Sequence, residues 1–278
     1  MQNVAVQVAA DIKNALNADK LDLPSLPEVA LEIRDVAESE WVCAASLATV
    51  VGKDPGMAAQ IIRAANSPLF RAARPIEDLS HAISRIGVEY AANTVTSLAM
   101  KQMFQATSEL VENKIRQVWR DATRVAAWSS VLAKSYTKLQ PDQAALSGLT
   151  HCIGVLPILS WVEENERLVC DSMTLDRVIE SLHPTLGTMI LKHWNFPDEI
   201  VAVPENYQDL DRKVPEVDYV DIVMVSSLIS SQGADQDAIE EEWDSTDAFR
   251  RIGIPPQLDD LDFDALLEDI ASFTDIFS

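Results

Sequence analysis

The chain has 278 residues, 47% of them hydrophobic, which is enough apolar material to bury the core of one large domain or two small ones. Glycine is scarce, with 8 residues, and this argues against turn-rich β sandwiches and glycine-loop nucleotide folds and favours an all-helical chain. The net charge of −22 would repel nucleic acid and anionic membranes, so we expect neither as a partner.

The sequence patterns predict one helix after another along the first part of the chain. Ser25 and Glu28 have the spacing of a capping box that would open a helix. Asp54 followed by Pro55 predicts the start of another helix, because these residue types are favoured at the N-cap and the first helical position. Gly87 follows a short apolar helical pattern and predicts a left-handed helix end.

Two longer helical runs are predicted over residues 88–104 and 109–139. Residues 143–162 carry no formal charge, over a length that could cross a membrane. They include several polar residues as well as glycine and proline, so we interpret them as a buried central helix rather than a membrane span. Two-residue alternation is almost absent, and no sheet is predicted.

The last segment, residues 235–278, is strongly acidic. It also contains apolar residues at the spacing of one helix face, namely Phe263, Leu266, Leu267, Ile270 and Phe273. We therefore expect a helix over residues 263–273 that packs on the body of the protein. The alternative is an acidic tail exposed for a partner.

Several classes of site lack sequence support. There is no Walker loop, no GxGxxG fingerprint and no GxSxG elbow. Cys43, Cys152 and Cys170 are an odd number of cysteines without CxxC spacing, which indicates neither a disulfide framework nor a zinc ribbon. The first 20 residues read as an amphipathic helix rather than a signal peptide, so we expect a cytoplasmic protein.

The histidines are the next candidates for chemistry. His81 follows Ser80 at an expected helix start, and we interpret it as a capping or packing residue. His151 lies in the uncharged stretch, where an imidazole must find a partner or lose its charge. His183 precedes Pro184, which places it near the start of the next expected helix. From spacing alone, His151 and His183 are either satisfied structural histidines or metal ligands.

The motifs LPSLPEVALEIRDVAES, KDPGMAAQIIRAANSPLF and RPIEDLSHAISRIG resemble the first half of the HDOD domain, a bacterial module related to the HD-type phosphohydrolases. Downstream, QPDQAALSGLTHCIG and HPTLGTMILKHWNFPDEI resemble later segments of the same family. The resemblance implies an all-α helical bundle formed as a single unit over residues 1–278. Its expected parts are an N-terminal helical lobe (1–105), a degenerate HD-like lobe (106–234) and acidic C-terminal helices (235–278).

The resemblance also implies where the catalytic parent class would bind its divalent metals. The corresponding positions, which we expect to be vestigial, are Asp121, His151, Cys152, His183, Glu205, Asn206 and Ser227. Cys152 stands where the parent class has its bridging aspartate, so a hard cation would lack an oxygen ligand there. The alternative is a zinc ion held by a thiol and two histidines; otherwise Cys152 is an inert core residue.

The predicted function is therefore a non-catalytic signalling or adaptor module without metal or cofactor, which binds a protein partner or a small effector. The competing hypothesis is a metal-dependent phosphohydrolase that acts on a nucleotide or a phosphodiester. A third interpretation is a sensor of a cyclic dinucleotide, which would use first-lobe arginines: Arg63, Arg71, Arg74 and Arg85.

The loop between two helices of the first lobe is the expected partner-binding site, because loops on rigid scaffolds often carry binding residues. The candidate residues are Asn66, Ser67, Pro68, Arg71, Arg74 and Pro75. In the alternative interpretation, Asn66, Ser67 and Pro68 only end a helix. Arg71 and Arg74 are not needed for that, and an exposed arginine pair suits an acidic or phosphorylated partner.

Overall fold

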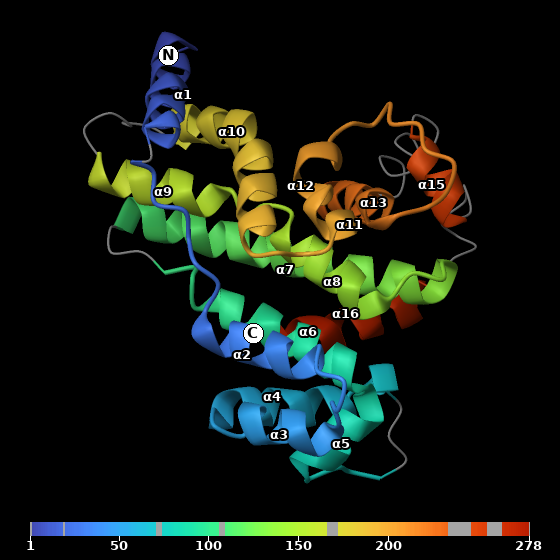
Figure 1. Cartoon of the computed structure of the whole chain (residues 1–278). Coiled ribbons are helices and arrows are strands. Elements are labelled where there is room, and N and C mark those ends of the chain that lie inside the picture. The colour runs from blue at the N-terminus through green and yellow to red at the C-terminus, as the bar shows by residue number, and fades with distance from the viewer. Residues whose placement is uncertain are drawn as a thin grey trace.

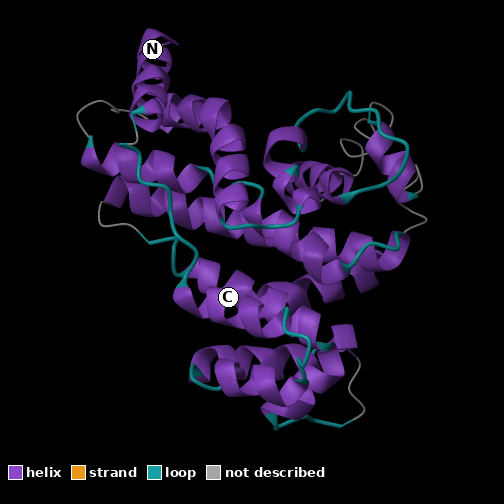
Figure 2. Ribbon diagram, in the orientation of Figure 1, coloured by secondary structure: helices purple, strands orange, loops and turns teal. Residues whose placement is uncertain are grey.

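The computed structural model describes residues 2–18, 20–70, 74–105, 109–165, 172–232, 246–254 and 263–277. Within these ranges the regular elements are all helices and there is no strand (Figure 2), which confirms the predicted all-α class. The elements are α1 (Gln2–Asn17), α2 (Glu28–Ala37), α3 (Ala44–Val51), α4 (Pro55–Asn66), the 3-10 helix η1 (Pro68–Phe70), α5 (Leu79–Ile86), α6 (Val88–Lys101), α7 (Glu109–Tyr136), α8 (Pro141–Thr150), α9 (Val155–Glu164), α10 (Ser172–His193), α11 (Asp198–Val201), α12 (Val203–Asn206), α13 (Tyr219–Gln232), α15 (Asp247–Ile252) and α16 (Phe263–Phe277).

The long helix α7 runs through the middle of the molecule, with α8 packed along it (Figure 1). In the view of Figure 1, α2 to α6 lie below α7 and α8, whereas α1, α9 and α10 lie above one end and α11, α12, α13 and α15 above the other.

One hydrophobic cluster joins helices of the first part of the chain to α8, α9 and α10. A second cluster joins α7, α13 and α15. The core is thus continuous across the predicted lobes.

Local sequence signals explain several helix ends. The Asp54 carboxylate accepts hydrogen bonds from the backbone N–H groups of Gly56 (2.8 Å) and Met57 (3.1 Å), so the predicted N-cap is confirmed. Gly87 has a φ of +94°, a conformation that other residues rarely adopt, and separates α5 from α6 as predicted. At α2, by contrast, the capping-box prediction is wrong, because the helix follows Pro27 without a side-chain cap.

The cap of α5 differs from the expected one. The Asp78 carboxylate accepts the backbone N–H of His81 at 2.8 Å, so Asp78 is the N-cap. The His81 side chain is 83% exposed. The prediction that His81 caps or packs is therefore wrong.

The uncharged stretch forms two helices rather than one. Residues Pro141–Glu164 are long and apolar enough to cross a membrane by composition alone, but 89% of their most apolar window is buried inside the protein. A turn at residues 151–154 separates α8 from α9. Gly154 is required there, because a Cβ atom would lie 2.1 Å from the carbonyl oxygen of His183 and 2.5 Å from the nitrogen of Gly187.

The helix α10 runs through His183 and Pro184 without ending and bends along its length (Figure 1). The expectation that His183 lies near a helix start is therefore wrong. Proline has no N–H to donate to the preceding turn, and its ring displaces the carbonyl of that turn, which accounts for a bend at Pro184. His183 consequently lies in the middle of α10, on its buried face.

The C-terminal helix α16 packs against α7, η1 and α4, so the prediction that it docks on the body is confirmed. Leu266, Phe273, Ile276 and Phe277 are buried, and Ile270 is partly buried. The side chains of Phe263 and Leu267 lie outside the described residues. Two hydrogen bonds near the end of α16 add to this apolar contact. Arg63 donates to the backbone carbonyl oxygen of Asp275 at 3.2 Å, and Lys101 donates to that of Phe277 at 3.0 Å.

Candidate functional site

Three rings meet in the interior of the protein: those of His151, His183 and Tyr207. His151 lies in the turn after α8, His183 in the middle of α10, and Tyr207 directly after α12. The Tyr207 hydroxyl oxygen is 3.0 Å from Nε2 of His183. The Tyr207 ring meets His151 edge to face, with the ring centroids 4.9 Å apart. All three side chains are buried.

The hydrogen bonds of the site fix its proton arrangement. Nδ1 of His151 is 2.5 Å from the carbonyl oxygen of Gly148, and Nδ1 of His183 is 2.8 Å from that of Ile179. A carbonyl oxygen can only accept, so each Nδ1 carries the proton and each Nε2 the lone pair. The Tyr207 hydroxyl donates to the lone pair of His183 and accepts a hydrogen bond from Nε2 of Gln208 at 2.9 Å.

Burial makes the site electrically neutral. It lowers the pKa of His151 to about 4, with a further lowering contribution from His183, and it also lowers the pKa of His183 itself. Burial raises the pKa of the Tyr207 hydroxyl and raises that of the Cys152 thiol to about 12. At neutral pH the two imidazoles, the phenol and the thiol are therefore all uncharged.

These residues do not fit a divalent metal. The lone pair of His183 is occupied by the Tyr207 hydroxyl, and the residue after His151 is a protonated thiol instead of a carboxylate. Hard cations require oxygen ligands, and zinc requires a thiolate if a cysteine is to bind it. In the part of the chain that the structure describes, His, Cys, Asp and Glu side chains form no group of three or more that could hold a metal ion.

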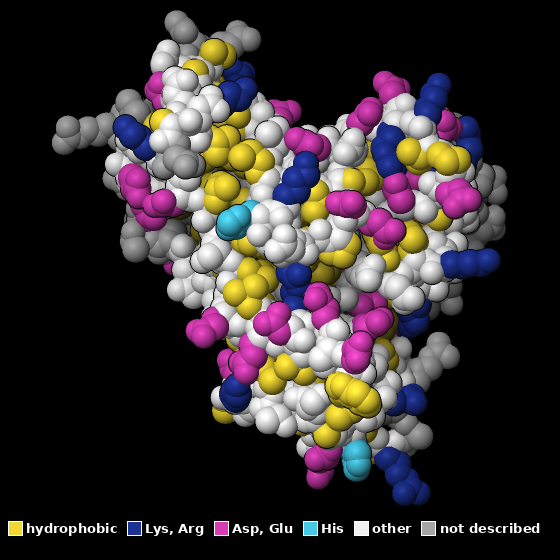
Figure 3. Space-filling model, in the orientation of Figure 1, with side chains coloured by type: hydrophobic (Ala, Val, Ile, Leu, Met, Phe, Trp, Pro, Cys, Tyr) yellow, Lys and Arg dark blue, Asp and Glu magenta, His cyan; other side chains and the backbone are white. Residues whose placement is uncertain are grey.

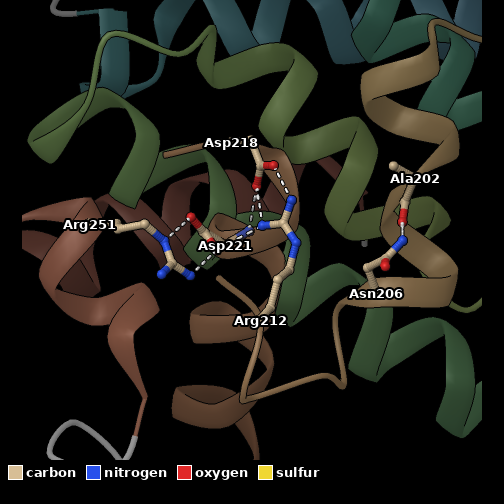
Figure 4. A network of polar contacts seen from close by, with 6 residues as sticks. All are labelled: Ala202, Asn206, Arg212, Asp218, Asp221 and Arg251. Carbon is tan, nitrogen blue, oxygen red and sulfur yellow. Dashed lines mark hydrogen bonds and ion pairs between the residues drawn. The ribbon is translucent and has the colours of Figure 1, made fainter. Parts of the chain in front are cut away.

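The structure places the other expected metal positions in different surroundings. Asp121 is half-buried and lies 2.5 Å from Arg124, and its charge raises the pKa of His151, opposing the effect of burial. Glu205 is exposed. The side-chain amide of Asn206 donates to the backbone carbonyl oxygen of Ala202, four residues earlier, at 2.7 Å (Figure 4). Ser227 is half-buried on α13. Their vestigial role stays a prediction.

A buried carboxylate that sequence reasoning missed lies beside this region. Asp221 on α13 is fully buried and lies between Arg212 and Arg251 (Figure 4). Arg251 donates from Nε and Nη2 at 2.7 Å each, and Arg212 donates from Nη1 at 3.0 Å while also binding Asp218. Two guanidinium groups bind the Asp221 oxygens, one from Arg212 in the loop after Tyr207 and one from Arg251 on α15. Asp221 therefore holds both that loop and α15 against α13.

The expected partner-binding loop is partly structural. The Asn66 amide donates to the carbonyl oxygens of Ile62 (2.9 Å) and Ile76 (2.8 Å), and its oxygen accepts the backbone N–H of Ile76 at 2.8 Å. Ser67 is the C-cap of α4 and Pro68 begins η1. Arg74 and Pro75 are exposed, whereas Arg71 lies outside the described residues.

The arginines that would bind a cyclic dinucleotide do not all remain available. Arg63 donates to the carbonyl oxygen of Asp275 at 3.2 Å. Arg85 donates to the carbonyl oxygen of Phe70 at 2.5 Å. Two of the four candidates thus bind the backbone, and this weakens the hypothesis of an arginine cluster for such a ligand.

Comparisons with known proteins bear on the family and the fold. The family model described as HDOD domain matches residues 23–210. The solved structure of a candidate metal-dependent phosphohydrolase from Shewanella amazonensis SB2B is 29% identical and covers 99% of this chain and 100% of that one, with a TM-score of 0.88. A candidate signal transduction protein from Marinobacter aquaeolei VT8 is 20% identical and covers 97% of this chain and 66% of that one, with a TM-score of 0.64.

A curated but uncharacterized protein from Treponema pallidum (strain Nichols) is also similar. It is 24% identical over an alignment of 235 residues, which covers 75% of this chain and 44% of that protein. The chain thus spans less than half the length of this curated relative.

Proposed function

This chain belongs to the HDOD domain family, and on that basis we propose that it is a non-catalytic signalling or adaptor module of the bacterial cytoplasm. In this proposal the chain binds a protein partner or a small effector and uses neither metal nor cofactor. The relation to signalling draws on the name of the Marinobacter protein, whose likeness to this chain concerns the fold.

The contact between Tyr207 and His183 carries the proposal. A phosphohydrolase of the HD type needs histidines with free lone pairs and carboxylates around a metal ion, which activates water by lowering its pKa. Here the Tyr207 hydroxyl is hydrogen-bonded to Nε2 of His183, and Cys152 stands beside His151. The His183 ring is hydrogen-bonded at both nitrogens, to Tyr207 and to the carbonyl oxygen of Ile179, as in a protein core, which favours a structural role over catalysis.

The second candidate function is a metal-dependent phosphohydrolase. It is favoured by the Shewanella structure, which bears that description and matches this chain over its whole length at 29% identity. In that case Tyr207 would have to move away from His183 before a metal could bind, and the donor set would still lack the carboxylate at Cys152.

A hydrolysis assay separates the two candidates. The chain is incubated with bis(p-nitrophenyl) phosphate and added Mn²⁺ or Zn²⁺, and release of nitrophenol is compared with that of metal alone. We expect no rate above the metal background, for the wild type and for His183→Ala alike. Turnover by the wild type that His183→Ala abolishes would support the phosphohydrolase and contradict our proposal.

For the partner surface we propose the loop after α4 with Arg71, Arg74 and Pro75. Arg74 and Pro75 are exposed, and an arginine pair can bind a carboxylate or phosphate in two-point fashion. Replacing Arg71 and Arg74 by serine is expected to reduce recovery of native partners in a pull-down without lowering the melting temperature. Lower stability with unchanged partners would mean that the loop is structural.

A further inference from the structure

A hollow with a volume of about 1110 Å³ lies between α4, α6 and α7. None of His151, His183 and Tyr207 lines it, so it is separate from the site described above. Its lining includes Lys101, Gln102, Asn113, Arg116, Trp119 and Arg120. We call it the α4–α7 groove. Its size is sufficient for a small organic ligand.

The α4–α7 groove has more cations than anions, although the chain has a net charge of −22 and scattered acidic side chains on the face in Figure 3. Three cations, Lys101, Arg116 and Arg120, face two carboxylates, Asp54 and Glu112. The Asp54 carboxylate is engaged as the N-cap of α4, and Glu112 is paired with Arg116. Within the described residues Arg120 is exposed and has no ion pair or hydrogen bond.

Two other hollows of the described structure have the opposite charge balance. The one bordered by η1 and the start of α8, about 590 Å³, contains Glu89 and Asp142 against Lys134. A smaller one beside α9, about 260 Å³, contains Asp22 and Glu163 without a cation. A small anion would therefore be drawn to the α4–α7 groove rather than to either of these.

An aromatic wall accompanies the cations. Trp119 is half-buried, and its ring lies against the buried ring of Phe104, with centroids 4.9 Å apart and planes at 55°. Trp119 is thus held in place by Phe104 while it lines the groove one turn from Arg116 on the same helix. Indole rings stack on flat ligand rings, and neighbouring arginines bind phosphate oxygens.

We propose that the α4–α7 groove binds a small molecule in which a phosphate is attached to a flat ring system. The phosphate would lie at Arg120, which has no ion pair within the described residues, and would compete with Glu112 for Arg116. The ring would lie against Trp119. The amide side chains of Gln102 and Asn113 line the same groove and can hydrogen-bond the edge of the ring. This inference rests on the proposed function, because it specifies the small effector of a non-catalytic module.

Isothermal titration with matched ligands tests the proposal on the full chain. AMP carries both features, adenosine only the ring, and ribose 5-phosphate only the phosphate. We expect AMP to bind at least about tenfold more tightly than either fragment, since both contacts add. Arg120→Ser should weaken AMP about tenfold and leave adenosine unchanged. The matched control is Arg124→Ser, one turn further along α7 and paired with Asp121 outside the groove.

Trp119→Leu should weaken AMP and adenosine but not ribose 5-phosphate, and its melting curve shows whether the fold is intact. The proposal is overturned if AMP gives no heat at millimolar concentration, or if Arg120→Ser and Arg124→Ser bind AMP equally. Phosphorus NMR of the same samples keeps the two proposals apart. Absent binding without release of phosphate overturns only the groove, whereas release of phosphate from AMP contradicts the non-catalytic function.

Discussion

The hydroxyl oxygen of Tyr207 lies 3.0 Å from Nε2 of His183 and links the end of α12 to the middle of α10. The same ring lies edge to face against His151, the other buried histidine of the site. Tyr207 thus uses the lone pair that a metal-binding histidine would offer. The site is held together by neutral hydrogen bonds, and its loss should be measurable as a loss of stability.

Tyr207→Phe is expected to lower the free energy of unfolding by about 1–3 kcal/mol, because Nε2 of His183 is left buried without a donor. Urea denaturation followed by circular dichroism measures the change. The control is Tyr136→Phe, at a half-buried tyrosine whose hydroxyl has no hydrogen bond within the described residues. Equal stability of the two variants would show that the Tyr207 hydroxyl contributes nothing.

The protein should become less stable as the pH is lowered, because His151 is buried in its neutral form. Its pKa is about 4 in the folded protein against 6.5 for the unperturbed group, so the unfolded chain takes up the proton first as the pH falls. The free energy of unfolding is expected to drop between pH 6.5 and pH 4, by roughly 3 kcal/mol from this residue. The lowered pKa of His183 acts in the same sense.

A difference measurement isolates this effect from the titration of carboxylates. His151→Asn removes the titrating group but can still donate to the carbonyl oxygen of Gly148. Its free energy of unfolding should depend less on pH than that of the wild type in this window, whereas the exposed His81→Asn should follow the wild type. Parallel curves for all three proteins would contradict the assignment.

Gly154→Ala is expected to destabilise the protein by more than about 3 kcal/mol, because backbone rather than a flexible side chain meets the new methyl group. The added Cβ would lie 2.1 Å from the His183 carbonyl oxygen, so the turn after α8 must move away from α10. Thermal melting measures the effect. Gly56→Ala, where the nearest atom is a side-chain oxygen of Asp54 at 3.2 Å, should change stability by less than about 1 kcal/mol. Similar melting temperatures for the two variants would rule out the close approach.

Arg251→Met should cost about 3–5 kcal/mol, because it removes one of the two arginines that compensate the fully buried Asp221. Chemical denaturation gives the value. The control Lys53→Met removes an exposed ion pair with Glu32 and should cost less than about 1 kcal/mol. If Arg251→Met is no worse than Lys53→Met, Asp221 does not depend on Arg251 for its charge compensation.

The parts of the fold that depend on residues close together in the sequence could be predicted. The caps at Asp54 and Gly87 follow from local backbone chemistry, and the docking of α16 follows from apolar spacing within one helix. The helix start expected near His183 and Pro184 is a local inference as well, but there the packing of both halves of α10 outweighs the missing hydrogen bond. Tertiary contacts decided that outcome.

The candidate site could be predicted only in part. The resemblance indicated His151, Cys152 and His183, but the partner of His183 is 24 residues away and is set by the packing of α12 against α10. One signal was available, since Tyr207 directly follows the expected ligand pair Glu205 and Asn206. A tyrosine at that place, with two histidines that lack a carboxylate, indicates a hydrogen-bonded core in place of a metal site.

The metal content of the purified protein shows whether His151 and His183 still hold a metal ion, and its measurement does not depend on finding a substrate. The chain is produced in medium supplemented with zinc, manganese and iron, purified without chelator and analysed by inductively coupled plasma mass spectrometry, with His183→Ala as the comparison. We expect far less than one metal ion per chain, for wild type and variant alike. One or more ions per chain in the wild type, lost in His183→Ala, would contradict a hydrogen-bonded core without metal.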